Sequence, residues 1–61
     1  MPLIEVTLYD TRINDETVPA LIAKLTDALC EVTTEDLRPY TWVHVHGLPA
    51  KQWGIGGEPQ G

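Results

Sequence analysis

Two short segments of the chain alternate between apolar and polar residues. The segment "PLIEVTLY" places apolar residues at every second position from Ile4 to Leu8, and "TWVHVHGL" does the same with Val43 and Val45. Leu3, Glu5, Thr7 and Tyr9 occupy the opposite face of the first segment. Alternation with a period of two, carried by β-branched residues, is typical of β-strands. The pattern therefore predicts one strand near each end of the chain.

Between these segments, apolar residues recur every three or four positions from Val18 to Val32. This spacing forms one apolar stripe and predicts an amphipathic α-helix. Proline is tolerated only in the first turn of a helix, so Pro19 requires the helix to begin close to Asp15. Three polar residues are candidates for its N-terminal cap: Asn14, Asp15 and Thr17.

The connecting segments are polar or rich in glycine. "DTRIND" is typical of a turn, and "TTEDLRPY" predicts a loop in which Pro39 holds Arg38 outside the α region. The glycines of "PAKQWGIGG" favour a short hairpin or a bent extended segment. A strand, a crossover helix and a second strand predict two parallel strands joined in the right-handed sense. We therefore expect a single α+β domain over residues 1–61, a β-α-β unit with a short C-terminal hairpin.

Size and composition indicate an oligomer. The chain has 61 residues, of which 43% are hydrophobic and 21% charged, so it is not disordered by composition. A chain this small buries only about 60% of its unfolded surface and usually needs disulfides, a metal ion or oligomerisation. Cys30 is the single cysteine and cannot form an intrachain disulfide. Two strands and one helix are not stable alone, so we expect other copies to cover the sheet.

The charge and the distribution of apolar residues exclude several classes of partner. The formal net charge is −5, with only four Lys and Arg residues, which argues against binding to nucleic acid or anionic membranes. The chain has no apolar run of about 18 residues and no basic segment followed by an apolar one at its start. We expect a soluble, cytoplasmic protein with no nucleic-acid or membrane partner.

The C-terminal segment "QWGIGGEPQG" places Trp53 and Ile55 among glycines. A phosphate-binding glycine loop needs a helix after it and a Lys near the end of its motif. Here no helical pattern follows, and Lys51 precedes the glycines. Because large apolar side chains need cover, we expect Trp53 and Ile55 to pack against another chain.

Three features, in this order and spacing, resemble the 4-oxalocrotonate tautomerase family. They are the opening "MPLIEVTL", Arg12 just before the helix, and "WGIGG" near the end. The resemblance covers nearly the whole chain and implies protomers assembled as dimers into a homohexamer, without a cofactor. It also implies that Met1 is removed and that the amine of Pro2 is the catalytic base. The implied reaction is keto–enol tautomerisation of 2-oxo acid enols such as 2-hydroxymuconate or phenylenolpyruvate.

This chemistry is physically reasonable for such a chain. Desolvation in an apolar site disfavours a charged amine, and a base poised near the working pH transfers protons efficiently. The apolar residues available to form such a site are Leu3, Trp53 and Ile55. By resemblance, Trp53 lies near Pro2 of a neighbouring subunit, and Arg12 binds the substrate carboxylate, for which a planar guanidinium is well suited.

The chain departs from the family pattern at several positions. The prototype has a second arginine early in the second strand, where this chain has Trp42; Arg38 is an alternative cation. The chloroacrylate-hydrating dehalogenases of the superfamily have a water-activating carboxylate where this chain has Ile55. They also pair two arginines around the first turn, where this chain has Tyr9 and Arg12. Isomerisation is therefore favoured over hydration, and a dicarboxylate substrate is disfavoured.

The remaining candidates have alternative interpretations. Trp42 is a pocket wall or an interface anchor, and the phenol of Tyr9 can orient substrate. His44 and His46 share one strand face and suit Zn or Cu, but two ligands do not make a site, so we expect no metal. The histidines then lie on an interface or polar sheet face, or His44 lines the active site. The alternative functions are a non-catalytic or partner-dependent subunit of a mixed tautomerase-like oligomer, or a hydratase or dehalogenase of the same superfamily.

Overall fold

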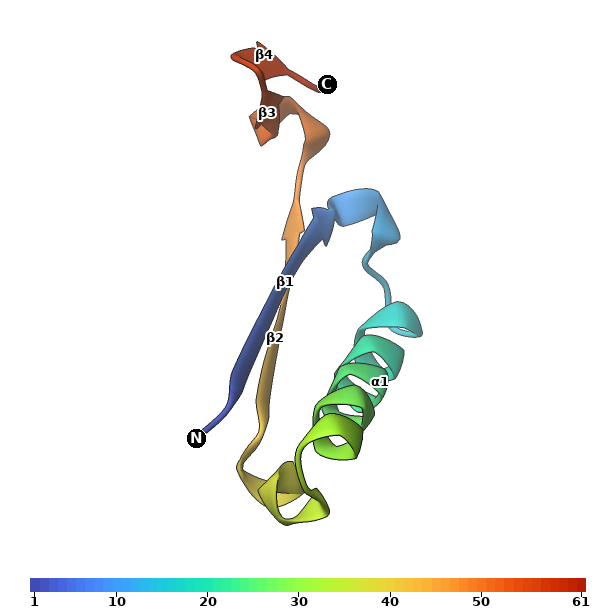
Figure 1. The fold of residues 1–61 in the computed structure, drawn as a ribbon. Coiled ribbons are helices and arrows are strands. Elements are labelled where there is room, and N and C mark those ends of the chain that lie inside the picture. Colours follow the sequence, from blue (N-terminus) through green and yellow to red (C-terminus); the bar gives the residue numbers. More distant parts are fainter.

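The computed structural model describes residues 1–61 and has the element order that the sequence pattern predicts (Figure 1). Strands β1 and β2 pair in parallel, in a register that runs from Leu3 beside Trp42 to Tyr9 beside Leu48. The chain ends in a short antiparallel hairpin of β3 and β4. The bounds are β1 Leu3–Tyr9, α1 Thr17–Val32, β2 Trp42–Leu48, β3 Gly54–Ile55 and β4 Glu58–Pro59. The predicted parallel β-α-β unit with a C-terminal hairpin is confirmed.

Helix α1 lies along one face of the β1–β2 pair, and no element of the chain covers the other face (Figure 1). In β1 the residues from Ile4 to Leu8 alternate between half-buried and exposed, with the apolar positions half-buried. In β2, Val43 and Val45 are half-buried, whereas Trp42, His44 and His46 are exposed. The predicted faces are thus confirmed. We call the uncovered side the open face.

Asn14 caps the start of α1. Its side-chain oxygen accepts hydrogen bonds from the backbone N–H groups of Glu16, at 2.8 Å, and Thr17, at 2.9 Å. Its carbonyl accepts the N–H of Val18 at 3.2 Å. These bonds satisfy donors that the first turn of a helix leaves free. The first turn therefore reaches back to Asn14, and Pro19 lies close enough to the start of the helix to be tolerated.

The segment predicted to be a loop between α1 and β2 is instead a 3-10 helix, η2, over Glu35–Tyr40. Thr34 caps it, and the N–H of Thr41 donates to the carbonyl of Arg38 at 3.3 Å. The expectation that Pro39 holds Arg38 outside the helical region is wrong, because η2 runs through both residues. Short 3-10 segments are common as connectors, and here the turn closes without a donor from Pro39.

The chain has almost no interior of its own. Cys30 is the one buried residue among the 61, at 4% exposure, as expected for a small packed side chain. The radius of gyration is 14.2 Å, whereas a compact chain of this length would have about 10.5 Å. The exposed large apolar residues are Met1, Leu3, Ile22, Val32, Tyr40, Trp42 and Ile55. The single α-helix lacks the length and apolar character of a membrane-spanning segment.

Candidate active site

The six candidate residues, together with the neighbouring Leu3, fall into two groups at opposite ends of the paired strands (Figure 1). The Pro2 end comprises Pro2, Leu3 and Trp42. The Arg12 end comprises Tyr9, Arg12, Trp53 and Ile55. Strand β1 has seven residues, so its ends are separated by about 20 Å at the usual rise per residue. One chain therefore does not bring Pro2 and Arg12 together.

At the Pro2 end, the backbone joins the candidate base to Trp42. The N–H of Trp42 donates to the carbonyl of Pro2 at 2.9 Å, and Leu3 is the register partner of Trp42. Pro2 is half-buried, while Leu3 is 52% and Trp42 51% exposed. These side chains provide apolar surface next to Pro2, but within one chain that surface remains open to water.

At the Arg12 end, two aromatic rings pack against each other. The ring centroids of Tyr9 and Trp53 are 4.5 Å apart at an interplanar angle of 48°, within the range of favourable aromatic pairs. The N–H of Gln60 donates to the carbonyl of Trp53 at 2.8 Å, which ties the hairpin to this residue. Trp53 is half-buried within its own chain, and the packing expected against another chain would add to this contact. Ile55 has no such cover and is 59% exposed.

The structural reason for this packing is the 3-10 turn η3 over Ala50–Gln52, between β2 and the hairpin. Two backbone hydrogen bonds close this turn and bend the chain soon after β2 ends. The N–H of Gln52 donates to the carbonyl of Pro49 at 2.9 Å, and the N–H of Trp53 donates to the carbonyl of Ala50 at 3.0 Å. The parallel register places Tyr9 beside the last residue of β2. The bend and the register together bring the indole against the phenol ring.

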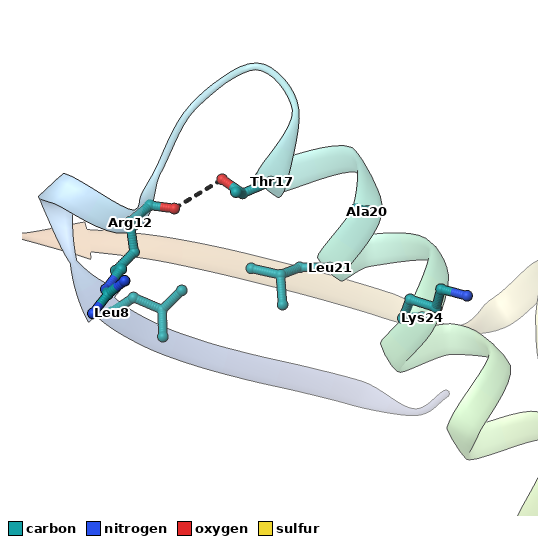
Figure 2. Close-up of a pocket in the computed structure, with 6 residues that line it drawn as sticks. All are labelled: Leu8, Arg12, Thr17, Ala20, Leu21 and Lys24. Atoms are coloured by element: carbon teal, nitrogen blue, oxygen red, sulfur yellow. Dashed lines mark hydrogen bonds between the residues drawn. The ribbon is translucent and has the colours of Figure 1, made fainter.

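Arg12 lines a pocket of about 480 Å³ between the end of β1 and the start of α1 (Figure 2). Leu8 comes from β1, Arg12 from the 3-10 turn η1 over Asp10–Arg12, and the rest of the lining from α1. The hydroxyl of Thr17 donates to the carbonyl of Arg12 at 2.8 Å, which links the Arg12 turn to the helix start. The full lining is Leu8, Arg12, Thr17, Ala20, Leu21 and Lys24.

Both charged residues of this pocket are cations, Arg12 and Lys24. Only four Lys and Arg residues exist in a chain of net charge −5, so half of them line one pocket. In Figure 2 the Arg12 guanidinium lies beside Leu8 at one end of the pocket, whereas the Lys24 amine lies at the other end and points away from Arg12. An apolar hollow with a few polar groups is the usual form of a small-molecule site. This pocket suits a carboxylate that carries an apolar body.

Sequence analysis did not identify Lys24 as a site residue. The spacing of Thr17, Leu21 and Lys24, at four and three residues, puts them on one helix face. That signal was present in the sequence, but only the fold shows that this face meets Arg12. Lys24 lines the part of the pocket far from Leu8 in Figure 2.

Trp53 contributes to a second, smaller hollow of about 270 Å³ that includes Thr7 and Leu48. Thr7 alternates with the half-buried residues of β1, so this hollow lies on the open face, opposite α1. Arg12 and Trp53 therefore share one end of the sheet but line different hollows.

Arg38, the alternative second cation, is already paired within its chain. Its guanidinium contacts Asp27 at 2.9 Å and also binds Glu35. The hydrogen bonds to Glu35 and Asp27 raise the pKa of Arg38 above its ordinary value. Arg38 thus fastens η2 to α1, and a substrate carboxylate would have to compete with two carboxylates already bound to it.

Comparisons with protein-family models, with curated proteins and with solved structures found no match. Function is therefore inferred from the chain itself. Its geometry divides the candidate site into a half that contains Pro2 and a half that contains the Arg12 pocket.

Proposed function

We propose that this chain is a tautomerase of the 4-oxalocrotonate type that acts on 2-oxo acid enols. The observation that carries the proposal is the Arg12 pocket, an apolar hollow with two cations in an acidic chain. The amine of Pro2, freed by removal of Met1, takes the proton from the enol hydroxyl as the carbonyl forms. It then delivers that proton to carbon, so that atoms and charge balance over the cycle. Enols such as phenylenolpyruvate or 2-hydroxymuconate are the expected substrates.

Arg12 binds the carboxylate next to the reacting carbon. A guanidinium offers paired donors that match a carboxylate and fix its orientation. Binding there also draws electron density toward the carboxylate as charge develops in the transition state. The bond from Thr17 to the Arg12 carbonyl supports this role, because it limits the freedom of the turn that carries the guanidinium.

The proposed site needs more than one chain, because Pro2 and Arg12 lie at opposite ends of β1. A second copy related by a two-fold axis, pairing strand edges in the antiparallel sense, would bring the Pro2 end of one chain to the Arg12 end of the other. Pairing would also cover a free strand edge and give a four-stranded sheet with both helices on one face. The single buried residue per chain supports such an assembly. Three such dimers would form the homohexamer that the resemblance implies.

The test measures enol ketonisation by ultraviolet absorbance, with mass spectrometry to establish that Met1 has been removed. The matched control is a chain with a short extension before Pro2, which converts the amine to a non-basic amide. General-base catalysis is typically worth about 10²–10⁴-fold, so the extended chain should lose activity on that scale. Pro2→Ala should retain part of the activity, because a terminal primary amine has a pKa of about 8.

Two outcomes would contradict the proposal. An extended chain as active as the processed chain would show that Pro2 is not the base. A processed, assembled chain with no activity on either enol would favour a non-catalytic subunit.

A further inference from the structure

Two histidines and one carboxylate gather on the open face, between the two ends of the sheet. Glu5 in β1 is the register partner of His44 in β2, and His46 follows two residues later on the same face. Oε1 of Glu5 lies 3.4 Å from Nδ1 of His44 and 3.6 Å from Nε2 of His46. All three ligand atoms lie within 4.8 Å of one another. One carboxylate oxygen is thus shared between two imidazole rings.

The two Glu5 contacts fit metal ligands better than direct hydrogen bonds, and the two histidine nitrogens lie within 4.8 Å of each other. An N–H···O hydrogen bond normally spans 2.7–3.2 Å, and both contacts of Glu5 are longer. Zinc bonds to nitrogen and oxygen are about 2.0–2.2 Å long, so two ligands of a tetrahedral zinc ion lie about 3.3–3.5 Å apart. The rings of His44 and His46 are nearly perpendicular, at 86°, and offer different nitrogen atoms to the shared space.

In the single chain, the three side chains are exposed and free of competing cations. Their exposed fractions are 43% for His44, 53% for His46 and 57% for Glu5. Neither Lys nor Arg is paired with Glu5, whose ion-pair partners are the two histidines. An ion can therefore reach the cluster without breaking a salt bridge to a basic residue.

We infer that Glu5, His44 and His46 form a binding site for a divalent transition-metal ion, with Zn²⁺ as the best match. Two histidines and a glutamate are a ligand set that zinc uses when it keeps a fourth position for water or another small ligand. Imidazole nitrogen suits Zn, Cu or Ni, whereas Mg²⁺ and Ca²⁺ prefer oxygen ligands. The site adjoins the Pro2 end, because the ring centroids of His44 and Trp42 are 6.1 Å apart, but it does not rest on the proposed tautomerase activity.

Sequence analysis recognised His44 and His46 but expected no metal site, because two ligands are too few. The third ligand comes from β1, and only the strand register places it. Such a site would join β1 to β2 across the chain, so metal binding would stabilise the fold by mass action. A bound metal is one of the devices by which domains of this size offset a small core.

The test is calorimetric titration of the assembled full-length chain with ZnCl₂, together with thermal unfolding in Zn²⁺ and in chelator. We expect one ion per chain, a rise in Tm with Zn²⁺, and no comparable binding of MgCl₂. Mutating a group that only orients a metal ligand typically lowers the affinity for the metal about 10–100-fold. Removing a ligand, in Glu5→Gln or His46→Gln, should therefore weaken Zn²⁺ binding by about 100-fold or more.

Two control variants separate this site from other ligands. Glu31→Gln removes an exposed carboxylate from α1, and Cys30→Ala removes the only thiol. Both should bind Zn²⁺ like the unmodified chain. With the unmodified chain, Co²⁺ should give the visible absorption of a four-coordinate ion without the charge-transfer band of a thiolate, a result that needs no variant to fold. Absence of Zn²⁺ binding, equal binding of Mg²⁺, or unchanged affinity in both ligand variants would overturn the inference.

Discussion

At the Pro2 end, Leu3 and Trp42 are each about half exposed. At the Arg12 end, the Trp53 ring packs at a tilt against Tyr9, and the Arg12 turn is hydrogen-bonded to the start of α1. The same pair of strands supports both ends. The difference is that the Arg12 end is assembled by its own chain, whereas the Pro2 end has apolar surface that needs a partner.

This contrast fits the chemistry proposed for each end. A carboxylate-binding pocket needs donors held in fixed positions, and one chain can provide them through turns and caps. A neutral amine needs surroundings from which water is excluded, and one small chain cannot provide those. The proposed two-fold partner would cover the Pro2 end with residues of the Arg12 end, so that each end completes the other.

The largest expected effect comes from mixing two defective chains. One carries an extension before Pro2, and the other carries Arg12→Ala; each should be strongly impaired alone. If every site takes Pro2 from one chain and Arg12 from its partner, random reassembly of equal amounts restores about a quarter of the sites. Activity is measured after mild dissociation and reassembly of the mixture.

The control for this experiment mixes the extended chain with itself under the same conditions, which should restore nothing. If the two-variant mixture also remains inactive, although mass spectrometry shows mixed oligomers, then both groups act from one chain. The contrast between complementary ends would then be wrong.

Next in size is the loss caused by Arg12→Ala in a uniform assembly. A hydrogen bond to a charged group is worth about 1.5–3 kcal/mol, so kcat/KM should fall about 10–100-fold for every enol substrate. Arg38→Ala is the matched control, because Arg38 is held by Asp27 and Glu35. Its kcat/KM should stay close to that of the unmodified chain. An equal loss in both variants would mean that Arg38 also reaches substrate.

The positions of the strands and the helix could be predicted from sequence because each depends on local periodicity. The alternation from Ile4 to Leu8 indicates a strand because one of its faces is covered and the other is not. Asn14 caps the helix through N–H groups two and three residues away in the sequence. The conformation around Arg38 could not be predicted in this way. The rule that a residue before proline avoids helical angles is a preference, and here ion pairs to α1 accompany the 3-10 turn.

The candidate site was less accessible to sequence reasoning because its contacts depend on register. Nothing local to Glu5 indicates that His44 lies beside it, and nothing local to Tyr9 indicates contact with Trp53. Both follow from how β1 and β2 are aligned and from the turn after β2. Lys24 has the helical spacing of a pocket residue, but its pocket exists only where α1 meets the Arg12 turn.

A smaller effect is expected at the Pro2 end, where Trp42, rather than an arginine, lies beside Leu3. The unmodified chain should prefer phenylenolpyruvate over 2-hydroxymuconate, because a second carboxylate against an indole loses hydration while an aromatic ring gains contact. Trp42→Arg should raise kcat/KM for the dicarboxylate about tenfold, in line with one added charge-assisted hydrogen bond.

Lys24→Gln is the companion variant for this measurement, because Lys24 is the other cation that lines the Arg12 pocket. If the unmodified chain strongly prefers the dicarboxylate, and Lys24→Gln removes that preference, the second carboxylate lies in the Arg12 pocket. The division of roles between the two ends would then need revision, with both carboxylates assigned to the Arg12 end.

The smallest expected effect concerns the hairpin that follows Trp53. Gly56 and Gly57 have φ values of 61° and 85°, in the left-handed region that favours glycine and suits a tight two-residue hairpin turn. Gly57→Ala should therefore destabilise the hairpin by about 1 kcal/mol.

Gly54→Ala is the matched control: an added Cβ would meet only the Glu58 carbonyl, at 3.8 Å, an ordinary contact. Amide hydrogen exchange at Gln60, whose N–H donates to Trp53, should be about fivefold faster in Gly57→Ala and nearly unchanged in Gly54→Ala. Equal rates in both variants would show that the Tyr9–Trp53 packing does not depend on this turn, and that the Arg12 end is ordered by the strands and η3 alone.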